Sequence, residues 1–190
     1  MAPKLFVMYA SPPCRAVMML AKEIELELEI EEVERSRLRT PEMLELNPEH
    51  TAPILVDDDF VLWDSHAIMY YLRLHFESGL LYQRCTTAIS PLFNGIGDIS
   101  DDDKDKIVEA YGFIEKYLET YSWVADEEMT IADFSILSTV VSIELVIPVE
   151  EDRFPKLTEW IAKGKALKYF DECNSQGLDH LKELIEAASA

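Results

Sequence analysis

Residues 4–31, KLFVMYASPPCRAVMMLAKEIELELEIE, predict a strand, a helix and a second strand in that order. The run from Lys4 to Tyr9 is short and apolar, as in a buried strand. After Ser11, apolar residues recur at helical spacing: Ala16, Val17, Leu20, Ala21 and Ile24. Residues 25–31 then alternate glutamate with leucine or isoleucine, the period of a strand with one wet face. This order indicates a βαβ unit with parallel strands.

The rest of the chain divides into a short α/β part and a long helical part. Thr40-Pro41-Glu42 begins a short helix that must end near Asn47-Pro48, because the residue before a proline resists the helical region. Residues 54–56 and 60–63 are expected to form a hairpin around the acidic turn 57–59. The pattern is helical from Asp64 onward. Further helices are expected over 100–121, over 130–146, from Phe154-Pro155, and over 178–187.

Composition and charge limit the functions open to this chain. It has 190 residues, enough for a buried core, and a formal net charge of -20, which repels nucleic acid and anionic membrane surfaces. No secretory signal and no membrane-spanning run is visible, so a cytoplasmic location is expected. Cys14, Cys85 and Cys173 are odd in number and widely spaced, which favours reduced thiols over a disulfide framework.

Ser11 occupies the position with the clearest chemistry. The unpaired N–H groups at a helix N-terminus stabilise an anion. Thioredoxin-like proteins place the first thiol of a Cys-x-x-Cys pair there, whereas this chain has Ser11-x-x-Cys14. A serine hydroxyl cannot exchange disulfides, but it can donate a hydrogen bond to a thiolate supplied by a ligand. Lowering the pKa of a thiol from ~8.5 by about two units requires only ~2.7 kcal/mol. The simpler alternative is that Ser11 is only an N-cap residue.

Three segments together carry a family resemblance. Residues 11–17 (SPPCRAV), 47–53 (NPEHTAP) and 64–68 (DSHAI) lie in this order along the chain. They resemble the opening segment, the N-P-x-H-T-x-P loop and the E/D-S-x-A-I turn of cytosolic glutathione transferases. The first is most similar to the insect delta and epsilon classes, and residues 73–84 resemble the epsilon class.

The resemblance implies a role for each residue that it covers on the thiol side. Ser11 would be the catalytic residue that stabilises the glutathione thiolate. His50 would contact the glycyl end of the tripeptide. Ala52 would pair its backbone with the cysteinyl unit, just before Pro53, which is cis in the family. Without the motifs, His50 is equally explained as a turn residue, and a cis-proline beside a sheet as purely structural.

The second half of the implied glutathione site lies at the start of the third helix. Asp64 and Ser65 would hold the γ-glutamyl ammonium and carboxylate, and His66 would line the same pocket. The alternative for Asp64 and Ser65 is a capping pair. In delta and epsilon members, a histidine or glutamine often stands three residues before the proline of the second helix. Here that position is Leu38, flanked by Arg37 and Arg39, so one contact to the glycyl carboxylate would be either missing or made by an arginine.

The helical half carries a structural motif and a weaker indication of a substrate pocket. Thr130-Ile131-Ala132-Asp133 predicts a capping box at the start of a buried helix, with no catalytic role. By resemblance to the epsilon class, Tyr82 and Arg84 would face the electrophile pocket. The alternative is that they are a core aromatic and a solvated arginine.

The implied architecture is that of a glutathione transferase. A thioredoxin-like domain with a mixed four-stranded sheet (residues 1–76) would precede an all-α domain (77–190). The expected activity is conjugation of glutathione to hydrophobic electrophiles, or a related elimination or isomerisation, in a homodimer that needs no metal. Two alternatives stay open: a transferase-like protein that binds ligands without turnover, and a purely structural interaction module.

One departure from the family concerns length. Tyr71-Leu72 runs directly into Arg73-Leu74-His75-Phe76, which already resembles the middle of the family's fourth helix. About two dozen family residues would be absent, more than an ordinary change of loop length. The third and fourth helices are therefore expected to fuse, or to meet at a kink near Gly79. Because these helices form most of the family's dimer interface, dimerisation is the property that this deletion affects most.

Overall fold

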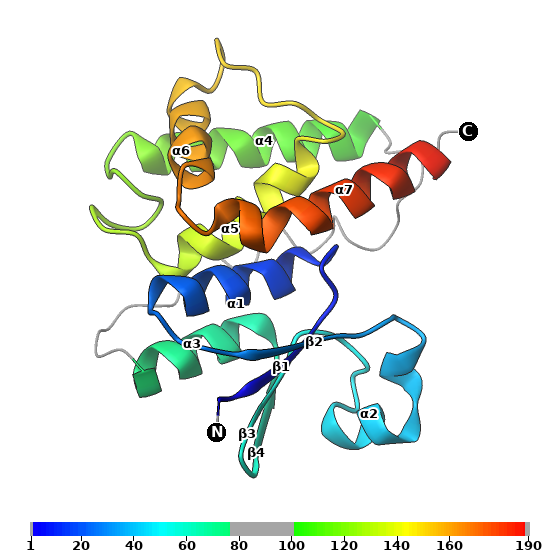
Figure 1. Cartoon of the computed structure of the whole chain (residues 1–190). Coiled ribbons are helices and arrows are strands. Elements are labelled where there is room, and N and C mark those ends of the chain that lie inside the picture. Colours follow the sequence, from blue (N-terminus) through cyan, green and yellow to red (C-terminus); the bar gives the residue numbers. More distant parts are fainter. Residues whose placement is uncertain (1, 77–100, 189–190) are drawn as a thin grey trace.

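The computed structural model describes residues 2–76 and 101–188. The strands are β1 (Lys4–Val7), β2 (Glu29–Glu32), β3 (Ile54–Asp57) and β4 (Phe60–Trp63). The helical elements are α1 (Pro12–Glu23), the 3-10 turn η1 (Arg37–Arg39), α2 (Pro41–Leu46), α3 (Ser65–Phe76), α4 (Asp101–Leu118), α5 (Ile131–Ile143), α6 (Pro155–Lys165) and α7 (Phe170–Ala188). The α/β elements and the helical elements form two stacked halves that meet along α1 (Figure 1).

The sheet is mixed and has the strand order β2-β1-β3-β4. Strand β1 pairs in parallel with β2, as the βαβ pattern predicts, and antiparallel with β3, which forms the expected hairpin with β4. The register places Phe6 opposite Ile54, and Ile54 opposite Trp63. The C-terminal end of β1, the N-terminal end of β3 and the C-terminal end of β4 therefore lie at the same end of the sheet.

The alternation of side chains along the strands divides the core into two clusters. Leu5, Val7 and Leu55 lie on the face that packs against α1 and α3, within the large cluster that extends into α5. Phe6 and Ile54 point to the other face, where a smaller cluster includes residues of η1 and α2. Because strand side chains alternate between faces, one short apolar strand serves both clusters. This thioredoxin-like arrangement confirms the predicted fold class.

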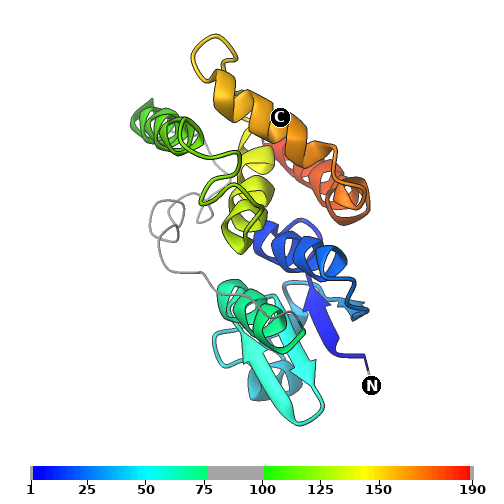
Figure 2. The same ribbon diagram turned by 90° about the vertical axis from the view of Figure 1, so that its left-hand side faces the viewer.

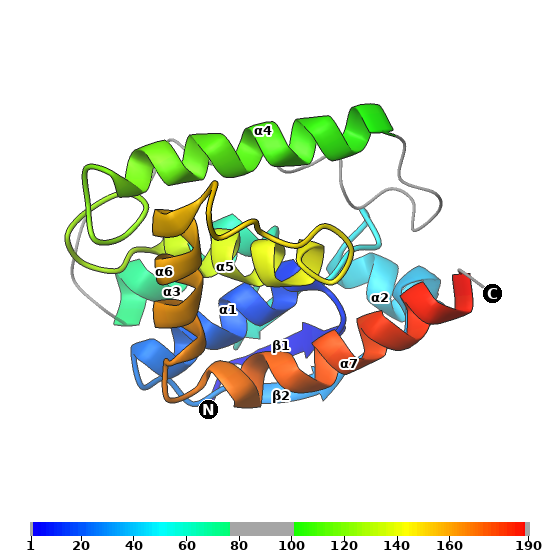
Figure 3. The ribbon, with the colours of Figure 1, turned by 90° about the horizontal axis from the view of Figure 1, so that it is seen from above.

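The helical half is organised around α5, which is buried nearly all round and packs against α1. Figure 2 shows α1 between α5 and α3, while Figure 3 shows α4 running across the top of the molecule above α5. The predicted capping box is present at the start of α5: Thr130 accepts from the Ala132 N–H, and Asp133 accepts from the Thr130 N–H. These contacts fix the first turn of the most buried helix.

Several boundaries differ from the sequence predictions. The strand expected over 25–31 begins only at Glu29, because Glu25 takes a positive φ of 56° at the end of α1 and the Leu26 N–H returns to the Ala21 carbonyl. The last helix begins at Phe170 rather than 178. The helices expected to reach 121 and 146 end at Leu118 and Ile143. Periodicity predicts the elements well, whereas their ends depend on local turns.

Within residues 2–76 and 101–188, no helix is both long and apolar enough to span a bilayer.

Candidate functional site

One end of the sheet brings together the three segments that the sequence singles out. The turn that contains Ser11 follows β1, Pro53 immediately precedes β3, and Asp64 and Ser65 follow β4 into α3. Since the register aligns these strand ends, the N-termini of α1 and α3 and the loop before β3 all open at this end. Helix N-termini present unpaired N–H groups and favour bound anions. The site can therefore attract an anionic ligand locally, despite the net charge of -20.

Ser11 is the N-cap residue of α1, but its hydroxyl does not cap the helix. Its backbone is extended, with φ -78° and ψ 115°, and its side chain makes no capping hydrogen bond. Pro12 and Pro13 occupy the first helical positions and have no N–H groups. The first turn therefore has fewer unpaired N–H groups for a capping side chain to bind. The half-buried hydroxyl of Ser11 therefore lies at the helix N-terminus without capping it, beside the Cys14 thiol with which its side chain interacts.

Cys14, the other member of the Ser11-x-x-Cys14 pair, is not accessible to a ligand. Its side chain is 0% exposed, and its sulfur accepts a long hydrogen bond from the Met8 N–H at 3.5 Å. Burial raises the pKa of the Cys14 thiol to about 11, against smaller opposing effects of its hydrogen bonds and of Arg15. At neutral pH the group is a buried neutral thiol. It is therefore a poor nucleophile, because the thiolate is the reactive form.

The loop before β3 is held by Asn47, whose side chain is fully buried. Its Nδ2 donates to the Thr51 carbonyl at 2.9 Å and to Thr51 Oγ1 at 3.0 Å, and its Oδ1 accepts from the Glu49 N–H. This clamp leaves His50 exposed, with a positive φ of 47°, and leads to the cis bond between Ala52 and Pro53. The loop that carries His50 and Ala52 is thus fixed from within.

At the start of α3, Asp64 does what the capping alternative predicts. Its Oδ1 accepts from the His66 N–H at 2.9 Å and from the Ala67 N–H at 3.0 Å, on a backbone with φ 73°. The Asp64 side chain is still 63% exposed, and capping uses only Oδ1. Ser65 beside it is 7% exposed. Capping and ligand recognition are therefore compatible at Asp64, because a carboxylate has two oxygens that can accept hydrogen bonds.

His66 lies in the first turn of α3 and reaches across to the helical half. Its Nε2 is 2.9 Å from Ser135 Oγ on α5, and its Nδ1 is 3.8 Å from Asp64 Oδ1. Burial lowers the pKa of His66, while Asp64 opposes that shift. A neutral imidazole that bridges α3 and α5 therefore helps to hold the two halves together beside the site.

Among residues 2–76 and 101–188, Arg15 is the largest fully buried side chain, and no role for it was predicted from the sequence. Its Nη2 donates to the Ser138 carbonyl at 3.0 Å and to Ser142 Oγ, both on α5, while Nε and Nη1 have no partner in the described part of the chain. Burial lowers the pKa of Arg15 to about 10, so the guanidinium stays charged at neutral pH. It ties the first turn of α1 to α5. The signal in the sequence was a cation on an otherwise apolar face of this helix.

Gly177 on α7 makes a second tight contact behind the Ser11 turn. A Cβ at this position would lie 2.0 Å from the Tyr9 carbonyl oxygen and 3.0 Å from Arg15 Nη1. Only glycine permits this approach, so α7 can support the segment that leads into Ser11. The close contact is visible only in three dimensions, because the two segments lie far apart in the sequence.

The arginines beside Leu38 differ in their partners. Leu38 itself is buried in the smaller core cluster and cannot contact a ligand. Arg37 pairs with Glu31 at 2.5 Å and with Glu42 at 3.6 Å. Arg39 is exposed and makes no ion pair in the part of the chain that the structure describes. Of the two, Arg39 is therefore the one free to meet a carboxylate.

Some predicted features lie outside the described residues: Tyr82, Arg84, Cys85 and the kink near Gly79. In the described part of the chain, α3 continues without a break through Arg73 to Phe76. No group of three or more His, Cys, Asp or Glu side chains in residues 2–76 and 101–188 is placed to hold a metal ion.

Comparison with known proteins gives the same assignment for both halves. The family model of the glutathione S-transferase N-terminal domain matches residues 5–79, and that of the C-terminal domain matches residues 83–167. "Glutathione S-transferase 1" of Manduca sexta is 32% identical over 210 residues, covering 95% of this chain and 96% of that protein. Because 210 exceeds the 190 residues of this chain, the alignment includes positions that the chain lacks, as the predicted shortening requires.

Solved structures agree closely with this fold. An epsilon-class glutathione S-transferase from the housefly Musca domestica superposes with a TM-score of 0.88 at 30% identity, over 98% of each chain. A glutathione transferase homologue from Drosophila mojavensis, solved with bound glutathione, gives a TM-score of 0.87 at 30% identity, over 98% of this chain and 97% of that one. The resemblance to insect delta/epsilon enzymes is thereby confirmed, and this chain belongs to the glutathione S-transferase family.

Proposed function

We propose that this chain activates the thiol of glutathione as a thiolate and transfers it to hydrophobic electrophiles. The observation that carries the proposal is the Ser11 hydroxyl, which lies at the N-terminus of α1 and makes no capping hydrogen bond. A hydrogen bond to a charged acceptor contributes about 1.5–3 kcal/mol, and the helix N-terminus adds about 0.3–1 kcal/mol. Together these match the ~2.7 kcal/mol that a two-unit shift of a thiol pKa requires. Cys14 is buried and cannot substitute.

The remaining contacts would hold the tripeptide along the sheet end. The clamp at Asn47 supports a loop from which His50 meets the glycyl end and the Ala52 backbone pairs with the cysteinyl unit, beside Pro53. Ser65 and the α3 N-terminus bind the γ-glutamyl carboxylate, and Asp64 binds the ammonium through Oδ2. The exposed Arg39 supplies a cation near the glycyl carboxylate. It takes the place of the histidine or glutamine that often stands in the family where this chain has Leu38.

His66 was expected to line the glutathione pocket, and its proposed role is instead to hold α3 against α5. Its ring is committed to Ser135, so it borders the glutathione pocket as a bridge between α3 and α5. It would thereby orient the α3 N-terminus for the ligand.

A glutathione-binding domain spans residues 1–76, and a helical domain spans 77–190, where Tyr82 and Arg84 border the electrophile. Detoxification in the cytoplasm by a homodimer is the biological setting that the family suggests. The shortened region after α3 bears on the dimer, because the family's dimer surface includes that region.

Retention on immobilised glutathione, followed by a conjugation assay with an aromatic halide, tests the function. We expect wild-type chain to bind and conjugate. The Ser11→Ala variant should bind but lose roughly ten- to a hundredfold in turnover, from the loss of one charge-assisted hydrogen bond. The exposed Ser175→Ala variant serves as the control and should behave as wild type. Binding without conjugation in wild type would support a non-catalytic binding protein, and failure to bind would support an interaction module.

The dimer is tested separately by sedimentation of this chain and of a version with a family-like linker restored between Leu72 and Arg73. A stable, active dimer from the short chain would show that the missing segment is dispensable.

A further inference from the structure

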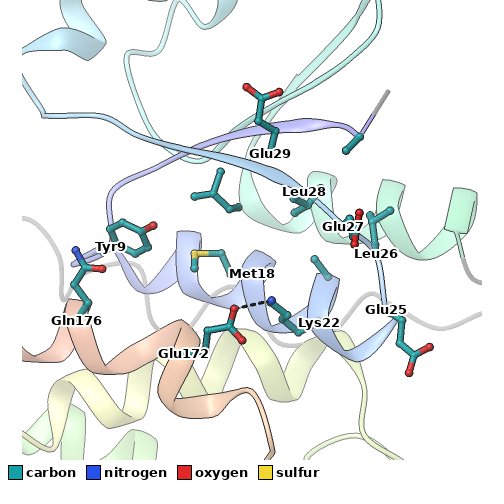
Figure 4. Close-up of a pocket in the computed structure, with 13 residues that line it drawn as sticks. Tyr9, Met18, Lys22, Glu25, Leu26, Glu27, Leu28, Glu29, Glu172 and Gln176 are labelled. Atoms are coloured by element: carbon teal, nitrogen blue, oxygen red, sulfur yellow. Dashed lines mark ion pairs between the residues drawn. The ribbon is translucent and has the colours of Figure 1, made fainter.

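Helix α7 runs antiparallel to α1 and reaches the N-terminal end of α1. Glu172 Oε1 lies 2.6 Å from Lys22 Nζ near the C-terminal end of α1, as Figure 4 shows. Further along α7, the buried Asn174 donates from Nδ2 to Met19 Sδ at 3.3 Å. Because residue numbers rise along α7 as they fall along α1, Gly177 arrives at the first turn of α1.

A groove of about 640 Å³ borders this helix contact on the side of β2 (Figure 4). It is lined by residues of α1, of α7 and of the segment that leads into β2. Tyr9 and Gln176 lie at one end of the groove, close to Ser11 in the chain. The next residue of α7, Gly177, then meets the backbone of the turn before Ser11 directly.

Gly177 leaves no space for a side chain at this contact. A Cβ on Gly177 would lie 2.0 Å from the Tyr9 carbonyl oxygen and 2.7 Å from the carbonyl carbon. Both are backbone atoms, so no side-chain rotation relieves the overlap. Glycine is also one of the least favourable residues in a helix interior, and Gly177 stands well inside α7. The close approach to Tyr9 therefore accounts for a residue that the helix itself disfavours.

Arg15 connects the same point to α5. Its Nη1 would lie 3.0 Å from a Cβ on Gly177, so the guanidinium and the Tyr9 carbonyl border the same small space. The Arg15 side chain is fully buried, and its Nη2 donates to the Ser138 carbonyl at 3.0 Å and to the Ser142 hydroxyl. The backbone at Tyr9 thus meets α7 directly and meets a cation that is anchored to α5.

The position of the Ser11 hydroxyl depends on this turn. Ser11 lies two residues after Tyr9, and its N–H donates to the Met8 carbonyl at 2.8 Å, so the chain turns tightly between them. A displacement of the Tyr9 carbonyl would therefore move Ser11 as well. A misplacement of about 1 Å, caused by a change far from the chemistry, can cost about a hundredfold in rate.

We propose that Gly177 and Arg15 are positioning residues for Ser11. Gly177 lets α7 close against the Tyr9 carbonyl, and Arg15 fixes the same turn to α5. Together they set where the Ser11 hydroxyl stands relative to the glutathione thiol, and neither contacts glutathione. This role rests on the proposed function of Ser11.

Gly177→Ala tests the role of α7, with Gly164→Ala as the matched control. A Cβ on Gly164 would lie 2.5 Å from Leu137 Cδ2, so this alanine also crowds a buried contact, but one between α6 and α5. For each variant, near-ultraviolet absorbance gives the pKa of the bound glutathione thiol, steady-state kinetics gives kcat and KM, and urea denaturation gives stability.

We expect Gly177→Ala to raise the pKa of the bound thiol by about one unit, because the hydrogen bond from Ser11 is weakened. At a pH below the wild-type thiol pKa, kcat should then fall roughly tenfold. The difference should narrow as the pH rises past the thiol pKa of the variant, where the thiolate forms without help. KM for glutathione should stay nearly unchanged, and Gly164→Ala should keep the wild-type thiol pKa whatever stability it loses.

Ser142→Ala tests Arg15 without crowding the core, and it remains informative when Gly177→Ala does not fold. It removes one acceptor of Arg15 and should raise the pKa of the bound thiol by roughly half a unit, in line with one neutral hydrogen bond. The matched control is Thr139→Val. Like Ser142, Thr139 donates to the carbonyl four residues earlier on α5, but it has no bond to Arg15 in the part of the chain that the structure describes.

The thiol pKa of the wild-type complex separates the two proposals. A lowered wild-type value that stays the same in Gly177→Ala and Ser142→Ala would overturn the positioning role and leave the role of Ser11 intact. Equal rises in Gly177→Ala and Gly164→Ala would also overturn it, because the effect would then be general loosening. A wild-type thiol pKa at the value of free glutathione would overturn the proposed function of Ser11 itself.

Discussion

Thr130 and Ser11 each occupy the N-cap position of a helix, one in each half of this protein, and only Thr130 caps its helix. Thr130 caps α5: it accepts from the Ala132 N–H at 3.3 Å and donates to Asp133 Oδ2 at 3.0 Å. Ser11 stands at the same position on α1 and makes no capping bond. The difference lies in the first residues of each helix, because α1 begins with Pro12 and Pro13, whereas α5 begins with residues that carry N–H groups.

The comparison suggests how a functional hydroxyl can be distinguished from a structural one. A hydroxyl that caps a helix is satisfied by the protein, and its removal costs stability. A hydroxyl that makes no capping bond, at a helix end whose first two residues are prolines, contributes no such stability, and a bound ligand can use it. On this account Thr130 stabilises the fold, and Ser11 serves the chemistry. Substitution of Thr130 should therefore lower stability, whereas substitution of Ser11 should lower activity.

The largest loss of stability is expected from substitution of Asp133, which completes the α5 cap. This buried carboxylate accepts from the Thr130 N–H, the Val124 N–H and Trp160 Nε1 at 2.8–3.0 Å. Asp133→Ala leaves these donors unsatisfied and should lower the free energy of unfolding by roughly 3–5 kcal/mol, because each buried orphan costs about 1–3 kcal/mol. Urea denaturation measures this. The exposed Asp152→Ala is the control, and a loss below about 1 kcal/mol would show that the network is not structural.

A smaller effect is expected at Asp64, which has both a structural and a proposed ligand role. Asp64→Asn keeps an oxygen for the α3 cap but removes the negative charge. We expect KM for glutathione to rise about tenfold with kcat nearly unchanged, because the γ-glutamyl ammonium is remote from the sulfur and its binding is uniform. Steady-state kinetics with varied glutathione measures both constants. A normal KM would remove Asp64 from glutathione recognition.

Thr130→Ala should cost about 1 kcal/mol of unfolding free energy, the usual value of a lost N-cap. Turnover per folded molecule should not change. Thr130→Ser retains the hydroxyl and should restore most of the lost stability. If the serine variant were as unstable as the alanine variant, the hydroxyl would not be the stabilising group.

The smallest effect is the one that Ser11→Ala should have on stability. Without a capping bond to lose, the free energy of unfolding should change by no more than about 0.5 kcal/mol. The same urea denaturation compares this variant with Thr130→Ala. A loss as large as that of Thr130→Ala would mean that Ser11 caps α1 after all.

The parts that were predictable from sequence are those set by local pattern. The apolar strand that begins at Lys4, the hairpin around 57–59 and the box at Thr130 each depend on residues close together in the chain, so periodicity and capping chemistry predict them. Only the end of that strand differs, because it was expected at Tyr9 and lies at Val7. The resemblance of the three motif segments implied that they contact one ligand, which requires them to lie close together. The strand register brings these segments to one end of the sheet.

The unpredicted parts depend on contacts between distant segments. Arg15 meets Ser138, 123 positions away, and His66 meets Ser135, 69 positions away. The spacing of residues in the sequence does not identify either partner. The groove beside β2 has the same origin, because the alternation at 25–31 predicts a wet face but not the helix that will lie next to it.

The central claim is that the Ser11 hydroxyl stabilises the glutathione thiolate, and the pKa of the bound thiol tests it most directly. The thiolate is followed by its near-ultraviolet absorbance as glutathione bound to wild type and to Ser11→Ala is titrated with pH. A group that stabilises the anion lowers the thiol pKa, so the wild-type complex should ionise well below ~8.5, the usual value of a free thiol. The variant should ionise about one to two units higher, the shift expected from losing one charge-assisted hydrogen bond. Equal thiol pKa values in the two complexes would contradict the account.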